Sequence, residues 1–343
     1  MAHKRKSLFR LIITILIVTF ICSCSCAGEG EGAPEGNVGD SALISPEQGG
    51  GKVYEGFSVH YLDVGQGDCI FIRLGDGKNM LIDSGAESDI TASYIKDYLK
   101  AYAVNTIDYL VLTHPDADHV GNAIEIINSF SIGTAYIPDL LDLSRFPDYL
   151  PVYNLIKEKE INIEFSDMGD KIMGEGYAFA FLSPKEKKLS GSSYYELNGS
   201  ANPTETEIND VSPIIYLTAD GQRFLFTGDA GTSQEKLVLA NDKVLYKKFF
   251  KDIDVNLSEI DYLKVSHHGS NDACCEDFLS LIKPKNAVVS VGGGNAYGHP
   301  ASDLLLRLSV CSPNYRLFRT DLMGTVTVYK DDVGTYSVIT DAD

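Results

Sequence analysis

Short apolar runs alternate with amphipathic stretches from about residue 56 to the end of the chain. The apolar runs are rich in β-branched and aromatic residues and are bounded by turn-forming residues, which is the pattern of strands. The predicted strands lie at 57–63, 68–73, 79–83, 108–113, 134–138, 177–182, 212–218, 223–227, 261–265, 287–291, 316–320, 325–329 and 335–339. The predicted helices lie at 91–103, 120–130, 233–240, 274–282 and 302–309. Two mostly β halves with helices outside predict an α/β (α+β) fold, in which two sheets pack face to face under covering helices.

The N-terminal segment has a separate pattern. A basic stretch that ends at Arg10 precedes an apolar run of 11 residues at 11–21. That run is shorter than the roughly 20 residues that a membrane-spanning helix needs, and its size and flanks are typical of a secretory signal peptide. Gly, Glu, Pro and Ser dominate residues 27–52, and this composition predicts a flexible tether. We therefore predict three parts: a signal peptide at 1–23, a tether at 24–52 and one globular domain at 53–343.

The densest group of chemically active side chains follows the predicted strand at 108–113. His114, Asp116, Asp118 and His119 lie within six positions, between that strand and a predicted helix. A turn between a strand and a helix can aim several side chains at one point. Imidazole suits divalent transition metals, and carboxylate adds negative charge and a harder oxygen ligand. This turn therefore predicts a metal centre.

The order of motifs resembles that of metallo-β-lactamase-fold hydrolases. The spacing at 114–119 is similar to that family's HxHxDH signature, with Asp116 where the second His usually stands. Three further segments resemble its other motifs and follow in the family's order: 81–85, 224–229 and 263–270. The resemblance extends from about Phe57 to Ile339 and implies a four-layer αββα sandwich.

Within that superfamily, the chain resembles the hydrolase domain of ComEC-type competence proteins, in which this domain is fused to a DNA-translocating membrane channel. The resemblance rests on five segments: 60–68, 114–119, 267–270, 297–300 and 319–321. It implies that residues 53–343 form a metal-dependent hydrolase domain related to DNA uptake.

The same resemblance implies a centre with two divalent ions, Zn²⁺ or Mn²⁺, and a catalytic role for Asp118 and His268. Two such ions about 3.5–4 Å apart can share a water and lower its pKa toward neutrality. The implied ligands are His114 and Asp116 for the first ion, Asp118, His119 and either His267 or His268 for the second, and Asp229 as the bridge. The sequence leaves the choice between His267 and His268 open, and the other ring would face the substrate.

Other residues are implied in supporting roles. Asp83 would hold the ligand loop, although Asp-Ser-Gly is also ordinary turn chemistry. The broad family has a further ligand His before the bridging Asp, whereas this chain has none between His119 and His267. Asn209 or Asp210 would be a weak oxygen ligand there, or neither would bind. An oxygen-rich first site favours harder ions, so Mn²⁺ is as plausible as Zn²⁺. The missing His argues against a β-lactam or thioester hydrolase, because relatives with those activities usually keep it.

The charge of the chain bears on the substrate. The formal charge is −19, and removal of the basic residues 1–23 would make it −23. Nucleic-acid binding depends on Lys and Arg that neutralise phosphates, so this balance weighs against a tight, nonspecific DNA-binding protein. Bound metal cations dominate the field inside a site, and the charge is therefore compatible with a phosphodiesterase.

We predict a secreted, membrane-tethered hydrolase of phosphodiesters, with nucleic acid such as single-stranded DNA as the substrate. His299 would contact the substrate or protonate the leaving oxygen. Residues 21–24 resemble a bacterial lipobox, which would attach lipid to Cys24 and hold the protein at the extracellular face of the cell membrane. The alternative is secretion without lipid. Alternative functions are a phosphodiesterase of cell-wall or small-molecule substrates such as phosphorylcholine, and a surface module that binds metal without turnover. The sequence indicates no obligate protein partner.

Overall fold

The computed structural model describes residues 56–140, 143–184, 204–241, 245–331 and 333–342. The described residues belong to one compact unit. The predicted signal peptide, the tether and the lipid site at Cys24 lie outside the described residues. None of the helices in the described part is both long and apolar enough to span a membrane.

In the described part of the chain, the first sheet has eight strands in the order β15-β14-β1-β2-β3-β4-β5-β6. Their bounds are β1 Ser58–Tyr61, β2 Ile70–Arg73, β3 Asn79–Ile82, β4 Thr106–Val111, β5 Ser131–Ile137, β6 Asn162–Phe165, β14 Val326–Lys330 and β15 Tyr336–Thr340. The strands from β3 to β6 pair in parallel, and the other pairs are antiparallel. Parallel neighbours need crossover connections, and helices α1 Asp89–Ala101, α2 Ala117–Val120, α3 Ala123–Ser129 and α4 Tyr149–Glu158 lie in these connections.

The second sheet has seven described strands in the order β13-β12-β11-β10-β9-β8-β7. Their bounds are β7 Lys171–Gly174, β8 Tyr177–Phe181, β9 Ile215–Ala219, β10 Gln222–Phe226, β11 Tyr262–Lys264, β12 Asn286–Val289 and β13 Arg316–Arg319. Strands β10 to β13 are parallel, and β7 to β10 are antiparallel. The remaining helices are α5 Glu205–Asn209, α6 Thr232–Asn241, α7 Leu245–Phe249, α8 Glu276–Ile282, α9 Ser302–Cys311 and α10 Thr320–Met323, with 3-10 turns at Leu143–Arg145 and Ser266–Gly269.

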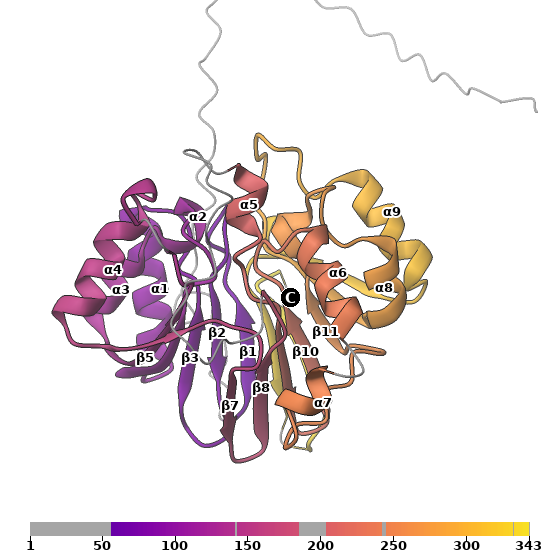
Figure 1. Cartoon of the computed structure of the whole chain (residues 1–343), viewed down its shortest axis with the longest axis horizontal. Helices are drawn as coiled ribbons and strands as arrows, with labels where there is room; N and C mark the ends of the chain where they lie inside the picture. Colours follow the sequence, from indigo (N-terminus) through magenta and orange to yellow (C-terminus); the bar gives the residue numbers. More distant parts are fainter. Residues whose placement is uncertain (1–55, 141–142, 185–203, 242–244, 332, 343) are drawn as a thin grey trace, which may run out of the picture. The chain divides into compact units, whose positions relative to one another are not determined.

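The two sheets lie between two groups of helices, with α1, α3 and α4 on one flank and α6, α8 and α9 on the other (Figure 1). Three buried clusters fill the spaces between these layers. Alternate residues of β10 show the arrangement: Phe224 and Phe226 face the cluster between the sheets, and Leu225 faces the cluster under the helices. Strands that are buried on both faces read as continuous apolar runs. The predicted four-layer αββα sandwich is thus confirmed.

All thirteen predicted strands are present, with ends that shift by a few residues. The elements that the apolar pattern missed are the edge strands β6 and β7, the short helices α5, α7 and α10, and the ten-residue helix α4. β6 and β7 have four residues each and mix polar with apolar side chains, so they lack a long apolar run. The predicted helix at 120–130 is two helices, α2 and α3, separated at Gly121 and Asn122. Helix α4 contains Pro151 in its first turn, where proline is tolerated because that N–H has no partner within the helix.

Candidate metal centre

The predicted site residues follow the carboxyl ends of parallel strands. Asp83 follows β3 and His114 follows β4 in the first sheet, while Asp229 follows β10 and the pair His267 and His268 follows β11 in the second. β3 pairs with β4, and β10 with β11, in parallel. Ligands in open α/β sheets bind at such carboxyl edges. The two sheets therefore bring their loops to one place.

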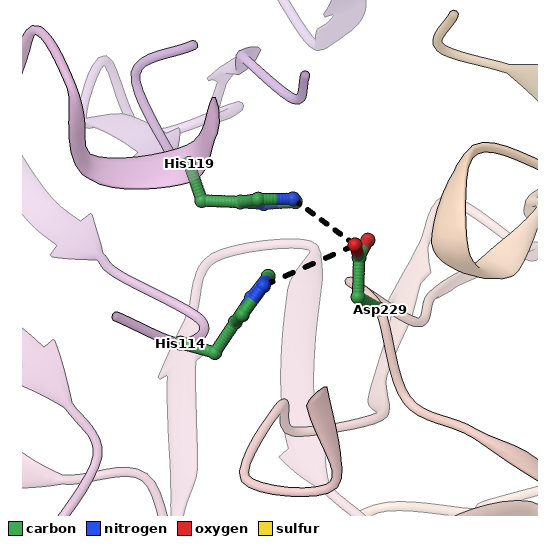
Figure 2. Close-up of side chains that lie close together, drawn as sticks. All are labelled: His114, His119 and Asp229. Atoms are coloured by element: carbon green, nitrogen blue, oxygen red, sulfur yellow. Dashed lines mark ion pairs between the residues drawn. The ribbon is translucent and has the colours of Figure 1, made fainter. Parts of the chain in front are cut away.

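Asp229 lies at the centre of this place. His114, His119 and Asp229 offer ligand atoms within 4.8 Å of one another, as do Asp118, His119 and His268. Figure 2 shows the rings of His114 and His119 pointing at the Asp229 carboxylate. The structure thus brings together side chains from 114–119, from the end of β10 and from the end of β11.

Four imidazole rings around Asp229 share one arrangement, in which Nδ1 has a protein partner and Nε2 faces the Asp229 Oδ2 atom. The Nδ1 partners are Thr113 Oγ1 for His114 at 3.1 Å, Asp83 Oδ2 for His119 at 2.8 Å, Asp272 Oδ1 for His267 at 3.1 Å and the Ser290 carbonyl for His268 at 2.9 Å. The distance from Nε2 to Asp229 Oδ2 is 3.3 Å for His119 and 3.4 Å for His268, and it is 3.9 Å for both His114 and His267. A donor bond from Nδ1 fixes the tautomer that leaves the Nε2 lone pair available, as in metal-binding histidines.

One half of the centre is compact. The Nε2 atoms of His119 and His268 are 3.3 Å apart, and each lies 3.3–3.4 Å from Asp229 Oδ2. An Asp118 oxygen lies 3.4 Å from His268 Nε2, and the other lies 3.9 Å from His119 Nε2. Ligand atoms held 2.0–2.2 Å from a tetrahedral ion are roughly 3.3–3.6 Å apart. These four side chains, with His268 rather than His267, therefore have the spacing of one coordination sphere.

The other half of the centre is more open. His114 Nε2 lies 3.6 Å from Asp116 Oδ2 and 3.9 Å from Asp229 Oδ2, and it is buried without a hydrogen-bond partner among the described residues. Asn209 donates from Nδ2 to His267 Nε2 over 3.3 Å. The Oδ1 atom of Asn209 is also buried without a hydrogen-bond partner among the described residues. Burial of polar atoms without partners is costly. A cation between His114, Asp116 and Asp229 would remove that cost for His114, so these residues fit a second ion.

Asp83 holds two parts of the ligand loop. Its Oδ1 accepts the Thr113 N–H at 2.8 Å, and its Oδ2 accepts Thr113 Oγ1 at 2.7 Å and His119 Nδ1 at 2.8 Å. Its backbone adopts a left-handed conformation, with φ of 59°. The turn before β2 also presses on this loop, because a Cβ atom at Gly67 would stand 2.3 Å from the Asp118 carbonyl. Only glycine fits that approach.

The His267–His268 pair lies in an unusual local conformation. Both residues have left-handed backbone angles, with φ of 48° and 50°, a conformation that costs of order 1–3 kcal/mol for residues other than glycine. The rings are 6.2 Å apart and inclined at 67°. This backbone allows two successive side chains to face Asp229, which a regular helix or strand would not.

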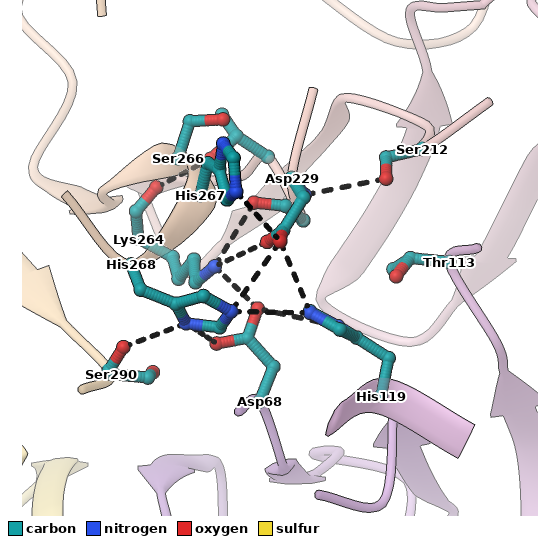
Figure 3. Close-up of polar contacts among 12 residues, drawn as sticks. Asp68, Thr113, His119, Ser212, Asp229, Lys264, Ser266, His267, His268 and Ser290 are labelled. Carbon is teal, nitrogen blue, oxygen red and sulfur yellow. Dashed lines mark hydrogen bonds and ion pairs between the residues drawn. The ribbon is translucent and has the colours of Figure 1, made fainter. Parts of the chain in front are cut away.

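A buried ammonium group lies behind Asp229, and the sequence reading did not include it in the site. Lys264 is fully buried, forms an ion pair with Asp68, donates to the Gly228 carbonyl at 3.0 Å and lies 3.7 Å from Asp229 Oδ1. Figure 3 shows the Lys264 ammonium, His268 and His119 around the Asp229 carboxylate, with Lys264 and His268 side by side. The available signal was a lysine inside the apolar run 261–265, since a lysine is almost never buried unless it is paired.

The charges of the centre favour two divalent ions. Five carboxylates face it against the one ammonium of Lys264, which gives a formal charge of −4 with neutral imidazoles. The carboxylates belong to Asp68, Asp83, Asp116, Asp118 and Asp229. Two divalent cations carry the opposite charge, so both half-sites can be filled without leaving a net buried charge.

The pKa values of the central groups are shifted by the same concentration of charge. Burial lowers the pKa of His268, but the charge of Asp229 and a hydrogen bond to Asp118 raise it to about 10. Burial also lowers the pKa of His119, but the charges of Asp229 and Asp83 raise it well above its usual range. Burial raises the pKa of Asp229, and the charges of His268 and His119 lower it well below its usual range. Each imidazole therefore attracts a positive charge, which a proton or a metal ion can supply.

Two predicted residues lie away from the ligand cluster. Asp210 accepts from Ser233 Oγ at the start of α6, so the structure does not place its carboxylate with the other ligand atoms. His299 stacks edge to face with His267, with ring centroids 5.7 Å apart. Burial and the charges of His267 and His268 lower the pKa of His299. Both roles predicted for His299, substrate contact and protonation of the leaving oxygen, stay predictions.

The fold and the ligand cluster define a class of protein. The sequence profile of the Metallo-beta-lactamase superfamily matches residues 62–293. The chain therefore belongs to the metallo-β-lactamase superfamily, and it is a metal-dependent hydrolase by fold and family.

Three curated relatives narrow the comparison. The chain is 28% identical over 296 residues to ComE operon protein 3 of Bacillus subtilis (strain 168), which covers 82% of this chain and 34% of that protein. It is 27% identical to Competence protein ComA of Neisseria gonorrhoeae, over 78% of this chain and 32% of that protein. It is 25% identical to Recombination protein 2 of Haemophilus influenzae (strain ATCC 51907 / DSM 11121 / KW20 / Rd), over 74% of this chain and 26% of that protein. The resemblance to ComEC-type proteins is confirmed, and this chain spans about a third or less of those relatives' length.

Proposed function

We propose that this chain is a binuclear metal-dependent phosphodiesterase that cleaves nucleic acid strands, with single-stranded DNA as its substrate. The observation that carries the proposal is the convergence of four tautomer-fixed imidazoles on one Asp229 oxygen. The first half-site, with Asp116 in place of a histidine, is oxygen-rich, which suits Mn²⁺ or Zn²⁺. The names of the relatives, two of them competence proteins and one a recombination protein, favour a substrate among nucleic acids.

Each side chain has a role in this proposal. His114 and Asp116 hold one ion, Asp118, His119 and His268 hold the other, and Asp229 joins them. The ions, Zn²⁺ or Mn²⁺, lower the pKa of water and neutralise phosphoryl charge when they are bound. His267, whose Nε2 lies 3.9 Å from Asp229 Oδ2, and His299, whose ring meets the His267 ring, would contact the substrate. Asn209 supports the His267 ring through its 3.3 Å contact.

The proposal is tested with the full-length chain loaded with Mn²⁺ or Zn²⁺. We expect it to cleave bis-p-nitrophenyl phosphate and a single-stranded DNA oligonucleotide, and we expect His119→Ala to abolish both activities. Asp252→Ala is a matched control, because this exposed carboxylate pairs with Lys171 at the surface and has no contact with the centre. Hydrolysis of a lactone or a β-lactam with no cleavage of either phosphodiester would overturn the proposal.

The acidic chain favours one competing substrate class. A formal charge of −19 reduces long-range attraction of DNA, and small phosphodiesters such as phosphorylcholine derivatives need no such attraction. The two classes differ in salt dependence, because each neutralised phosphate adds to the slope of log affinity against log salt. We expect a shallow slope with DNA, and a rate on phosphorylcholine esters that exceeds the rate on DNA at every salt concentration would favour the competing class.

We also propose that the protein is held at the extracellular face of the cell membrane by lipid on Cys24. The support is the signal-peptide pattern and the lipobox-like residues 21–24. Stable anchoring needs two acyl chains, because one gives only marginal binding. Cys24→Ala should lose labelling by a palmitate analogue and release the protein into the medium, and labelling that persists would refute the anchor and leave secretion without lipid.

A further inference from the structure

A line of three aromatic rings leads from the metal centre to the surface, and we call it the ring ladder. It consists of His267, His299 and Tyr297. His267 Nε2 lies 3.9 Å from Asp229 Oδ2, and the His267 and His299 ring centroids are 5.7 Å apart at 74°. The rings of His299 and Tyr297 are stacked, with centroids 5.6 Å apart and an angle of 24°. Tyr297 is 68% exposed, so the ladder ends in a large aromatic ring that water reaches.

The ladder is held in place by its own loop. Asn295 donates from Nδ2 to the Gly292 carbonyl at 3.0 Å and to the His299 carbonyl at 2.7 Å, and its Oδ1 accepts the His299 N–H at 3.0 Å. The Gly292 N–H in turn donates to Gln66 Oε1 at 3.2 Å. The loop is thus closed on itself and attached to the turn before β2. An exposed tyrosine on such a loop loses little conformational entropy when a ligand stacks on it.

Two basic side chains on this side of the described structure are already paired with carboxylates. Arg319, at the end of the neighbouring β13, is held by a bidentate pair with Asp321, and Lys264 is buried against Asp68. Stacking of bases on aromatic rings does not depend on charge, and it contributes to single-strand binding in many proteins. An acidic protein that binds a nucleic acid strand is therefore expected to use rings rather than lysines beside its active site.

We propose that the ring ladder is a base-stacking subsite, in which Tyr297 holds a nucleobase of the strand whose phosphodiester lies at the metal centre. The inference rests on the proposed phosphodiesterase function and adds a requirement for unpaired bases in the substrate. Unpaired bases are a property of single-stranded nucleic acid, since duplex bases are already stacked on their neighbours. Tyr297 is a substrate-binding residue in this assignment.

Turnover by the full-length, Mn²⁺-loaded chain tests the subsite with two oligomers of equal length. One is a single-stranded DNA, and the other has the same phosphodiester backbone without bases. Tyr297→Ala should raise KM for the DNA by about 5- to 100-fold, which corresponds to the loss of one stacked base, and should leave KM for the base-free oligomer unchanged. Tyr297→Phe should behave as the unaltered chain. Leu322→Ala, which removes an apolar side chain that is 65% exposed, is the matched control.

A binding measurement separates this inference from the proposed function. A phosphorothioate oligonucleotide that contains 2-aminopurine resists cleavage, and its fluorescence falls when the base stacks. We expect quenching with the unaltered chain and not with Tyr297→Ala. Quenching that depends on Tyr297, in a protein that cleaves no phosphodiester, would support the subsite while the phosphodiesterase fails. Cleavage of both oligomers with KM values that Tyr297→Ala leaves unchanged, or changes equally, would overturn the subsite and leave the phosphodiesterase standing.

Discussion

The two halves of the metal centre share Asp229 but are built differently. In the half formed by Asp118, His119 and His268, the distances from each imidazole Nε2 to Asp229 Oδ2 are 3.3 and 3.4 Å. In the half formed by His114 and Asp116, His114 Nε2 lies 3.6 Å from Asp116 Oδ2 and 3.9 Å from Asp229 Oδ2. The compact half has the ligand spacing of a tetrahedral ion, whereas the open half has fewer imidazoles and wider gaps.

This difference affects how tightly each half of the centre is expected to bind a metal ion. Ligands that are already placed pay less ordering entropy when an ion binds, so we expect the compact half to bind first and more tightly. The open half, with more oxygen ligands, is expected to bind weakly and to set which metal supports activity. The compact half is also supported by the buried pair of Lys264 and Asp68, and His114 has only the Thr113 hydroxyl behind it.

The largest effect is expected from the residue that the halves share. In the proposed binuclear phosphodiesterase, Asp229→Ala should remove both ions and lower the rate by about a thousandfold or more, because metal ions supply several kcal/mol of transition-state stabilisation. Elemental analysis and initial rates measure the two effects. Retention of two ions per chain in this variant would contradict the assignment of Asp229 as the bridge and with it the comparison of the two halves.

Next in size is the buried pair behind the compact half. Lys264→Met leaves the Asp68 carboxylate buried without its ammonium partner, and we expect the free energy of unfolding to fall by about 3–5 kcal/mol. Urea unfolding followed by circular dichroism measures this change. Lys330→Met is the matched control: it removes an ion pair with Asp220 in which the two side chains are 38% and 42% exposed, and such surface pairs contribute about 0–1 kcal/mol. Equal urea midpoints in the two variants would show that the buried pair does not support the centre.

The apolar pattern predicted two packed sheets, and the ligand turn predicted a metal centre, whereas the family resemblance supplied Asp229 and the 267–268 pair. Strands buried on both faces, such as β10, appear as apolar runs, and the ligand turn at 114–119 is local in the chain. The edge strands β6 and β7 were missed because each has only four residues, two of them apolar. Lys264 and Asp68 are almost two hundred positions apart, so only the packing of the sheets shows their pairing.

The choice between His267 and His268 also depends on three-dimensional structure. The Nε2 atoms of His267 and His268 lie 3.9 and 3.4 Å from Asp229 Oδ2, but the left-handed backbone at 267–268 places His268 Nε2 beside His119 and Asp118. His267 instead meets Asn209 and His299. Sequence spacing does not distinguish two neighbouring residues when their backbone conformation is irregular.

Variants that each lack one ligand distinguish ion binding in the compact half from ion binding in the open half. His268→Ala should weaken the tightly bound ion by more than about 100-fold, since loss of an outer partner alone costs 10- to 100-fold. His114→Ala should leave that ion in place and reduce the stoichiometry from about two ions to one. Competition against a chromogenic chelator measures both. If His114→Ala removes the tight ion and His268→Ala removes the weak one, then the ranking of the halves is reversed.

Over a single pH unit, the smallest expected effect is the pH dependence of ion binding to the compact half. In the absence of bound ions, burial lowers the pKa of His268, and Asp229 and Asp118 raise it to about 10. The imidazole is therefore protonated at pH 7, and an ion has to displace this proton to bind. Affinity should rise by up to about tenfold per pH unit for each proton displaced, and this rise should end as the pH passes about 10. Titration calorimetry at pH 7 in two buffers with different ionisation enthalpies counts the released protons. Binding enthalpies that agree in both buffers would mean that no proton is displaced, and the compact half would then owe its affinity to geometry alone.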